Sequence, residues 1–156
     1  MELEYLSSHR GCYGCSPSNP SGLKLRFFSD GGVIKAEFIP SQAYAGYEGL
    51  THGGIIACLL DEVMGAAAGY EQGRPCFSAE LKVRFLAPLP IDKKVILLAE
   101  RVANKKRLWL TRGEIRDDEG CIYARAQGKY LPLSDSKRAK IEQQLNVSLT
   151  TPEQIL

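Results

Sequence analysis

One segment of this 156-residue chain has the periodicity of a long α-helix, while the segments on both sides of it alternate like β-strands. Between Gly53 and Tyr70 there is no proline, and Gly69 supplies a stop signal near the end. At about 100° per residue, one helix face is bulky and apolar: Ile56, Leu59, Leu60, Val63 and Ala67. The opposite stripe is small and carries a single carboxylate: Gly54, Cys58, Asp61, Gly65 and Ala68. A lone helix of this kind must bury its bulky face against a sheet.

The alternating segments supply that sheet. Two of them precede the helix, at 23–27 and 34–38, and the turn residues Ser29 to Gly32 between them predict a hairpin. Four more follow the helix, at 77–87, 94–103, 108–116 and 121–131. Short turns separate these four, which predicts an antiparallel meander. The predicted fold class is α+β, with an antiparallel six-stranded sheet wrapped around one long central helix.

The remaining segments are expected to be irregular or short. Residues 11–22 are rich in proline, glycine and serine, which predicts a lead-in loop. The tail, 134–156, holds a short amphipathic helix from Ser134 to Leu145 and a second helix start at Thr151 to Gln154. Because 156 residues fit one core, we expect residues 1–156 to form a single domain with the central helix at 53–70.

Composition excludes several classes of protein. With 44% hydrophobic and 24% charged residues, the chain is an ordinary globular one rather than a disordered or collagenous one. The formal net charge is +2 and the densest basic cluster, 101–107, is short, so we expect no nucleic-acid partner. No apolar run reaches membrane-spanning length and the N-terminus lacks an export signal, which predicts a cytoplasmic protein with no membrane partner. Five cysteines, an odd number, are then expected to be reduced thiols.

Common catalytic motifs are missing. The sequence contains no G-x-S-x-G, H-E-x-x-H, P-loop or G-x-G-x-x-G motif, so serine hydrolases, zincins and nucleotide-binding enzymes lose their usual signals. His9, Cys12 and Cys15 offer three metal-type ligands, but structural zinc sites generally use four and no second C-x-x-C follows. We therefore expect no metal site, and packing of the lead-in loop is the simpler explanation of these residues.

The start of the central helix is the best candidate for chemistry. Two glycines after His52 leave backbone N–H groups open at the electropositive end of the helix, where an oxyanion can bind. Asp61 lies seven residues beyond Gly54, about 10 Å along the helix axis, which is too far for one reacting carbon. The acid and the oxyanion donors would therefore come from two helices, as in a dimer with antiparallel neighbouring helices.

The residues His52-Gly53-Gly54 followed by Leu59-Leu60-Asp61-Glu62 resemble the hotdog-fold acyl-CoA thioesterases of the PaaI-like and THEM-like group. The order of elements, two strands, one helix and four strands, also resembles that fold. Further matches are Cys12-Tyr13-Gly14-Cys15, the stretch 19–23, Tyr47-Glu48-Gly49, and the strand from Ser78 to Phe85. The resemblance spans Cys12 to about Leu131.

The resemblance implies an acyl-CoA thioesterase that releases coenzyme A and a carboxylic acid without metal or bound cofactor. It implies a homodimer or dimer of dimers with shared active sites. Asp61 would be the catalytic carboxylate, as general base or nucleophile, and His52 would open the helix. Gly54 would donate its backbone N–H to the thioester oxygen, and Ser78 would face the site from the other chain. Gly46 is a departure, since some members carry Asn or Gln there.

Each candidate residue also has a simpler interpretation. Asp61 can satisfy buried backbone groups or pair with Arg84, and Glu62 is a rival acid that we expect to face solvent or a basic partner. His52 can act only as a helix cap, and Ser78 can be an ordinary strand residue. Lys82 and Arg84 can bind the phosphates of coenzyme A or be solvated charges at a strand end. The candidate substrate-binding residues are Gly53, Glu62, Tyr47, Lys82 and Arg84.

Two other functions remain open. A hotdog dehydratase usually pairs a histidine with an acid five residues away, and His52 has Tyr47 and Ala57 at those positions. A non-catalytic acyl-CoA binding module would share the pocket without turnover. A regulator of that kind would be expected to carry a DNA-reading helix-turn-helix, and none is visible.

Overall fold

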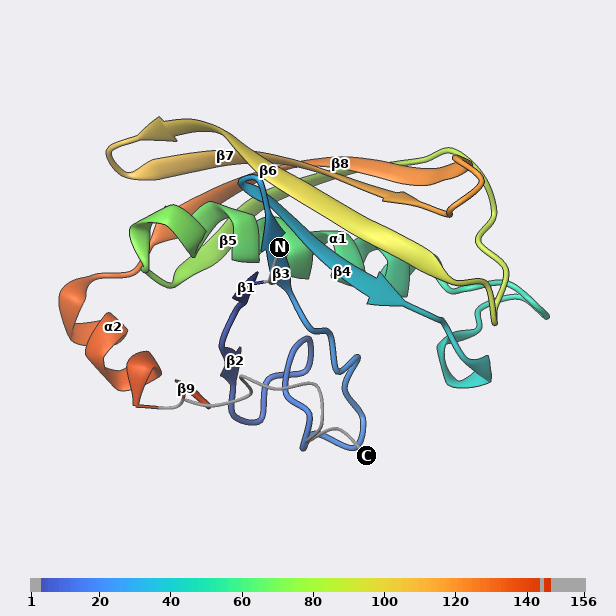
Figure 1. Ribbon diagram of the computed structural model, residues 1–156, viewed down its shortest axis with the longest axis horizontal. Coiled ribbons are helices and arrows are strands. Elements are labelled where there is room, and N and C mark those ends of the chain that lie inside the picture. The colour runs from blue at the N-terminus through green and yellow to red at the C-terminus, as the bar shows by residue number, and fades with distance from the viewer. Residues whose placement is uncertain (1–3, 144, 147–156) are drawn as a thin grey trace.

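A computed structural model describes residues 4–143 and 145–146 of the chain. Seven antiparallel strands form one sheet that packs over a single long helix, α1 (Gly53–Gly69) (Figure 1). The strand order is β1-β3-β4-β6-β7-β8-β5. The bounds are β1 Glu4–Tyr5, β3 Phe28–Asp30, β4 Val33–Phe38, β5 Cys76–Phe85, β6 Val95–Lys105, β7 Leu108–Arg116 and β8 Ile122–Pro132. The expected α+β class is confirmed, with seven strands in place of six.

Smaller elements complete the chain. A separate two-stranded sheet pairs β2 (Ser8–His9) with β9 (Leu145–Asn146). Two short 3-10 helices, η1 (Gln42–Tyr44) and η2 (Tyr70–Gln72), flank α1. The expected lead-in loop at 11–22 holds only turns and irregular backbone, as predicted.

The pairing of β5 differs from the expected meander. Strands β6, β7 and β8 do follow one another as a meander, but β5 pairs with β8 and β6 pairs with β4. The connection 86–94 is too long for a tight hairpin, and it lets the chain cross from one side of the sheet to the other. Periodicity identifies strands but not their partners, and the prediction of a four-strand meander is therefore wrong for its first strand. As a result β5 is an edge strand.

The segment 23–27, expected as the first strand, is not part of the sheet. Leu23, Leu25 and Phe27 are buried in alternation, as the pattern indicated. The N–H groups of Leu23 and Leu25, however, donate to the backbone oxygens of Tyr13 and Gly14 over 2.8 and 2.9 Å. The lead-in loop therefore takes the place of a neighbouring strand, and the ladder begins only at Phe28.

The bulky face of α1 forms the centre of the core, as predicted: Ile56, Leu59, Leu60, Val63 and Ala67 are all buried. Ala68, expected on the small stripe, is buried as well. By length and hydropathy alone, Gly53–Gln72 would suit a membrane span, contrary to the expectation that no segment does. Its apolar face packs against the sheet, as in the core helix of a globular domain.

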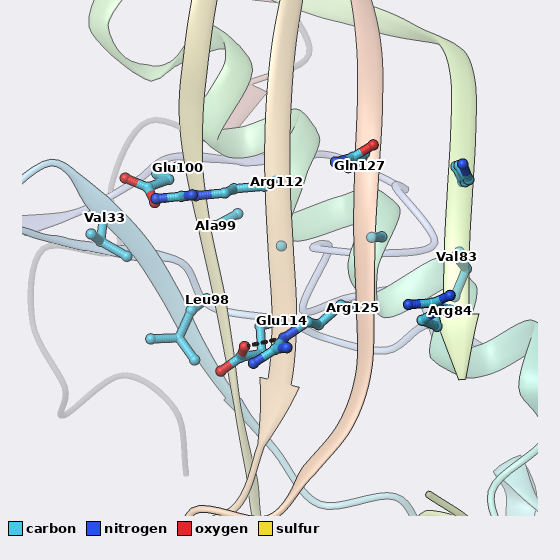
Figure 2. A pocket seen from close by; sticks show the side chains of 13 residues that line it. Val33, Val83, Arg84, Leu98, Ala99, Glu100, Arg112, Glu114, Arg125 and Gln127 are labelled. Carbon is cyan, nitrogen blue, oxygen red and sulfur yellow. Dashed lines mark hydrogen bonds and ion pairs between the residues drawn. The ribbon is translucent and has the colours of Figure 1, made fainter. Parts of the chain in front are cut away.

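The other face of the sheet carries charged side chains. Figure 2 shows Glu100, Arg112, Glu114, Arg125 and Gln127 in front of the strands, with α1 behind them. Arg125 and Glu114, on the adjacent strands β8 and β7, form an ion pair at 2.8 Å. These residues line a cavity of about 830 Å³ on the outer face. The sheet thus separates an apolar inner layer from a charged outer surface.

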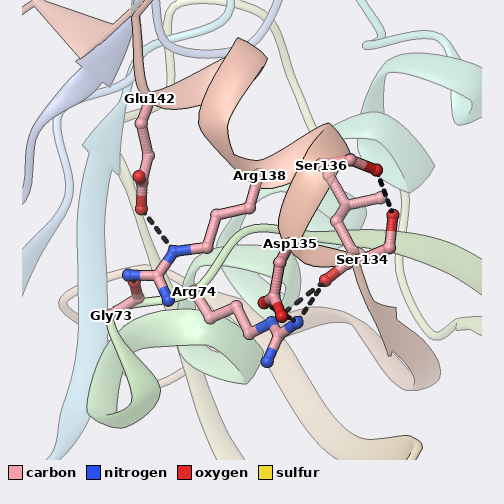
Figure 3. Close-up of polar contacts among 8 residues, drawn as sticks. Gly73, Arg74, Ser134, Asp135, Ser136, Arg138 and Glu142 are labelled. Atoms are coloured by element: carbon pink, nitrogen blue, oxygen red, sulfur yellow. Dashed lines mark hydrogen bonds and ion pairs between the residues drawn. The ribbon is translucent and has the colours of Figure 1, made fainter.

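The C-terminal helix α2 (Asp135–Glu142) is shorter than the predicted Ser134 to Leu145, and Ser134 occupies its N-cap position. Polar contacts attach it to the loop after α1 (Figure 3). Arg74 donates to the Leu133 carbonyl oxygen over 2.8 Å and to Asp135 over 2.8 Å. Arg138 pairs with Glu142 within α2. The second predicted helix start, 151–154, lies outside the described residues.

Candidate active site

The Asp61 carboxylate is held by hydroxyl groups from two strands. Ser78 Oγ donates to Asp61 Oδ1 over 2.7 Å, and the Tyr130 hydroxyl donates to the same oxygen over 2.9 Å. Ser78 on β5 and Tyr130 on β8 are register partners, so the sheet fixes the spacing of the two donors. Within the described part of the chain, no hydrogen bond or ion pair reaches Oδ2 of Asp61. The alternative pairing of Asp61 with Arg84 is therefore wrong, and Oδ2 remains available to a substrate or a water molecule.

The resemblance implied that Ser78 faces the site from the other chain. Ser78 lies beside Asp61 of its own chain, because α1 packs against β5. The β5–β8 register shifts between Ser78 and Glu80. A bulge of this kind redirects side chains and recurs next to active sites. Within one chain, the fold therefore pairs the acid with its hydroxyl donor without help from a partner.

Asp61, Ser78 and Tyr130 line a cavity of about 590 Å³. Small residues of α1, Gly65 and Ala66 among them, form one wall, and the N-terminal segment 4–7 contributes another. This volume lies within the range of roughly 300–1,000 Å³ typical of small-molecule sites. The small-residue stripe predicted on α1 thus borders a cavity around Asp61.

The start of α1 is capped by His52. Its Nδ1 accepts a hydrogen bond from the Gly54 N–H over 2.9 Å, and its backbone oxygen accepts from the N–H groups of Ile55 and Ile56. The capping role left open by the sequence is confirmed, and Nδ1 must be unprotonated to fill it. Gly54, the expected oxyanion donor, therefore has its N–H engaged, while in the described structure the N–H of Gly53 has no hydrogen-bond acceptor. Residues 52–54 lie outside the lining of the Asp61 cavity.

Glu62 is not in the environment that the sequence predicted. It was expected to face solvent or a basic partner, but it is half-buried against the lead-in loop, beside Gly14, Cys12 and Cys15. Burial, together with the nearby Cys12 and Asp61, raises the pKa of the Glu62 carboxyl to about 7. Glu62 lines the same cavity as Asp61, so it remains near any ligand bound there.

Three other predicted substrate-binding residues lie away from Asp61. Lys82 and Arg84 line the charged cavity on the outer face of the sheet, where Figure 2 labels Arg84. Tyr47, in the loop before α1, is 85% exposed. One chain by itself does not bring these side chains to the carboxylate.

Tyr130 is the site residue that the sequence analysis missed. It is 1% exposed and lies on the buried face of β8, as the alternation of 121–131 predicts. A buried tyrosine needs a hydrogen-bond partner for its hydroxyl. Periodicity shows that Tyr130 is buried, but only the packing of α1 against β8 shows that its partner is Asp61.

The family model of the thioesterase superfamily matches residues 48–122, which include α1 and Asp61. The human protein "Acyl-coenzyme A thioesterase THEM5" is 29% identical over 98 residues, covering 62% of this chain and 39% of the human one. The matched region of this chain thus spans about two fifths of the length of that relative.

Solved structures share the fold. The thioesterase superfamily protein RHA08564 superposes with a TM-score of 0.72 at 25% identity, covering 78% of this chain and 60% of that one. PaaI of Escherichia coli superposes with a TM-score of 0.66 at 19% identity, covering 72% of this chain and 81% of PaaI. A hypothetical thioesterase from Streptococcus pneumoniae, solved with coenzyme A, superposes with a TM-score of 0.62 at 17% identity. The match covers 66% of this chain and 82% of the streptococcal one. A sheet wrapped around one central helix is therefore common to these proteins and this chain.

Proposed function

We propose that this chain, a hotdog-fold member of the thioesterase superfamily, hydrolyses an acyl-coenzyme A thioester to coenzyme A and a carboxylic acid. The observation that carries the proposal is the Asp61 carboxylate, which two hydroxyl donors orient through Oδ1 while Oδ2 is left without a partner among the described residues, at a cavity. The substrate class is supported by the names of the human relative and of the streptococcal structure with coenzyme A.

In the proposed reaction Asp61 acts on water as a general base. Oδ2 takes one proton while the water oxygen attacks the thioester carbonyl carbon, and the carbonyl oxygen becomes an oxyanion. Collapse of this intermediate breaks the carbon–sulfur bond and expels the thiolate of coenzyme A, a good leaving group. Direct attack by Asp61 would instead form a mixed anhydride, which water then hydrolyses. Neither route requires a cofactor.

The oxyanion would bind at the start of an α1 helix, where backbone N–H groups and the helix dipole favour negative charge. The N–H of Gly53 is the unengaged donor, and that of Gly54 becomes a second donor if it leaves His52. Because Asp61 and Gly54 of one chain are about 10 Å apart along the axis, we propose that the two groups come from different subunits.

Edge strand β5 is the surface that we propose for this homodimer. Its outer side has no strand neighbour in the described chain, and ten residues of backbone are available for pairing. Phe77 and Phe85 on β5, and Leu86 just after it, are about half exposed, at 50%, 55% and 47%. The ring of Phe85 also lies next to Gly53, so that pairing at β5 would bring a second chain close to the start of α1. A dimer of dimers would add a further interface.

The test is a thiol-release assay over a panel of acyl-CoAs with wild type, Asp61→Asn and Glu62→Gln. Asp61→Asn should lower kcat at least about a hundredfold, the lower range for loss of a general base, with an unchanged circular-dichroism spectrum. Glu62→Gln should retain turnover. Saturable binding of acyl-CoA by wild type without turnover would support the binding module, and turnover of an enoyl-CoA by hydration would support the dehydratase.

Subunit complementation tests the shared site. Gly53→Pro removes the unengaged backbone donor at the first helical position, where proline is tolerated. Neither Gly53→Pro nor Asp61→Asn alone should be active, but mixed dimers should recover thiol release because each contains one intact site. Analytical ultracentrifugation gives the oligomeric state. A monomeric wild type, or the absence of recovery in confirmed mixed dimers, would contradict the shared site.

A further inference from the structure

Cys12, Cys15 and Glu62 form a cluster that the proposed reaction does not use. One Sγ atom from each cysteine and a carboxylate oxygen of Glu62 all lie within 4.8 Å of one another. The two cysteines come from the lead-in loop and Glu62 comes from α1. The sequence places Cys12 near Cys15, but only the fold adds a third ligand of a different chemical type.

The local backbone holds the cluster in place. A Cβ atom at Gly14 would lie 2.0 Å from Glu62 Cδ, so only glycine lets the loop approach the carboxylate this closely. The Gly14 carbonyl oxygen accepts a hydrogen bond from the N–H of Leu25, which is buried. The His9 N–H donates to Cys15 Sγ over 3.4 Å, an interaction that favours an electron-rich sulfur. The loop is therefore anchored on both sides of the two thiols.

The cluster has no cationic side chain paired with its carboxylate among the described residues. Glu62 is half-buried, and none of the ion pairs among the described residues includes it. Ionising a half-buried carboxylate without a nearby cation is costly, and the two neighbouring sulfurs offer no positive charge to compensate it. A bound cation would neutralise the three groups together, whereas a disulfide between the cysteines would leave Glu62 uncompensated.

We infer that Cys12, Cys15 and Glu62 bind one divalent transition-metal ion of the zinc type. Tetrahedral zinc with bonds of about 2.0–2.3 Å needs ligand atoms roughly 3.5–3.8 Å apart, a spacing that fits within the observed limit of 4.8 Å. Two thiolates select zinc over magnesium or calcium. Water from the cavity is the candidate for the fourth position, since all three ligands line that cavity. This site departs from the expectation of no metal, which rested on the ligands close in sequence alone.

The metal would fasten the lead-in loop to α1. Binding releases the two thiol protons to solvent and replaces them with metal–sulfur bonds, and Glu62 contributes one oxygen. The three ligands line the same cavity as Asp61, but Asp61 is not among them, so the ion would hold the loop and take no part in thioester cleavage. The inference is therefore independent of the proposed function, and it is tested without any substrate.

The test is an anaerobic titration of reduced, metal-free full-length protein with Co²⁺, followed by its displacement with Zn²⁺. We expect a sulfur-to-cobalt charge-transfer band and tetrahedral d–d bands that saturate at one ion per chain. Cys12→Ser and Cys15→Ser should abolish the charge-transfer band, and Glu62→Gln should weaken Co²⁺ binding at least about tenfold. Cys121→Ser is the matched control, since this exposed thiol lies in the β7–β8 turn, and it should bind like wild type.

Two results would overturn the inference: no charge-transfer band in the reduced wild type, or a band that survives both Cys12→Ser and Cys15→Ser. If the serine variants fail to fold, Glu62→Gln decides in their place, because unchanged Co²⁺ affinity would exclude Glu62 as a ligand. Zn²⁺ should also raise the Tm of wild type and of Cys121→Ser, but not that of the double variant Cys12→Ser/Cys15→Ser.

Discussion

Asp61 and Asp117 each accept a hydrogen bond of 2.9 Å from a tyrosine, Tyr130 and Tyr123 respectively, yet the rest of their surroundings differ. Asp117, at the turn after β7, is 3% exposed. It has three further partners: the N–H groups of Glu119 and Cys121, at 3.1 and 2.8 Å, and Lys93 Nζ at 3.3 Å. Asp61 has only hydroxyl donors and keeps one oxygen without a partner in the described structure, at a cavity.

The difference is the one expected between a structural carboxylate and a reactive one. A buried carboxylate with a cation, a hydroxyl and two amide donors has no capacity left to accept a proton or bind a ligand. A carboxylate that is oriented by one oxygen and free at the other has that capacity. Variants at the two aspartates and at their hydrogen-bond donors test this contrast.

The two aspartates should differ most in activity. Asp61→Asn is expected to lower kcat at least about a hundredfold, whereas Asp117→Asn should leave kcat of the folded protein within about twofold. Steady-state thiol release, measured well below the Tm of each variant, checks both. Equal losses in the two variants would mean that Asp61 has no special role.

Removing the Ser78 hydroxyl, the donor to Asp61 on β5, should have a smaller effect on activity. Ser78→Ala removes one of the two hydroxyls that orient Asp61. Loss of a hydrogen bond that contributes about 1–1.5 kcal/mol to catalysis corresponds to roughly a tenfold lower kcat. Ser78→Thr keeps the hydroxyl and should restore most of the activity. A threonine variant as slow as the alanine variant would assign Ser78 to packing instead of orientation.

At Asp117, loss of a hydrogen-bond donor should lower the thermal stability and leave activity unchanged. Tyr123→Phe keeps the ring but removes the donor to Asp117, and the Tm should fall by about 5 °C with kcat unchanged. Thermal unfolding followed by circular dichroism measures the first quantity and thiol release the second. An altered kcat with an unchanged Tm would contradict the assignment.

Lowering the pH should reveal how much the ionised Asp117 carboxylate contributes to the stability of the fold. Burial opposes its ionisation, but the hydrogen bonds from Tyr123 and the Cys121 N–H, and the charge of Lys93, outweigh burial and lower the pKa of Asp117. Because the unfolded chain then takes up the proton more readily, the stabilisation is complete at neutral pH and is lost as pH falls below about 4. The Tm difference between wild type and Asp117→Asn should therefore shrink from pH 7 to pH 3; a constant difference would exclude this linkage.

The smallest effect is expected at Lys93. This side chain also pairs with the exposed Glu119 at 3.1 Å, and it is itself 31% exposed, so solvent screens its attraction to Asp117. Lys93→Gln should change the Tm by no more than about 2 °C. A drop as large as that of Tyr123→Phe would show that the cation, and not the hydroxyl, holds the buried carboxylate.

The sequence predicted where the helix and strands lie better than it predicted which segments pair with one another. The bulky face of α1 and the run 108–116 of β7 were predicted correctly, because side-chain periodicity follows directly from helix and strand geometry. The placement of β5 beside β8 was not predicted, because pairing depends on how a nine-residue connection packs. The segment 23–27 alternates like a strand, yet a loop satisfies its N–H groups.

The same division holds for the candidate site. His52 and the two glycines after it are recognisable from the sequence, since a helix start needs a cap and small residues leave its N–H groups accessible. The hydroxyl of Tyr130 and the approach of Glu62 to the lead-in loop are contacts between residues far apart in the chain. No local pattern encodes them.

By itself, the amino-acid order of this chain determined one long amphipathic helix among alternating strands and the position of one carboxylate on the small face of that helix. The tertiary structure alone decided which groups surround each carboxylate: two hydroxyls at Asp61, a lysine and amides at Asp117, and two thiols at Glu62. Periodicity is a property of neighbouring residues, whereas the donors around a buried charge are brought together only when distant segments pack.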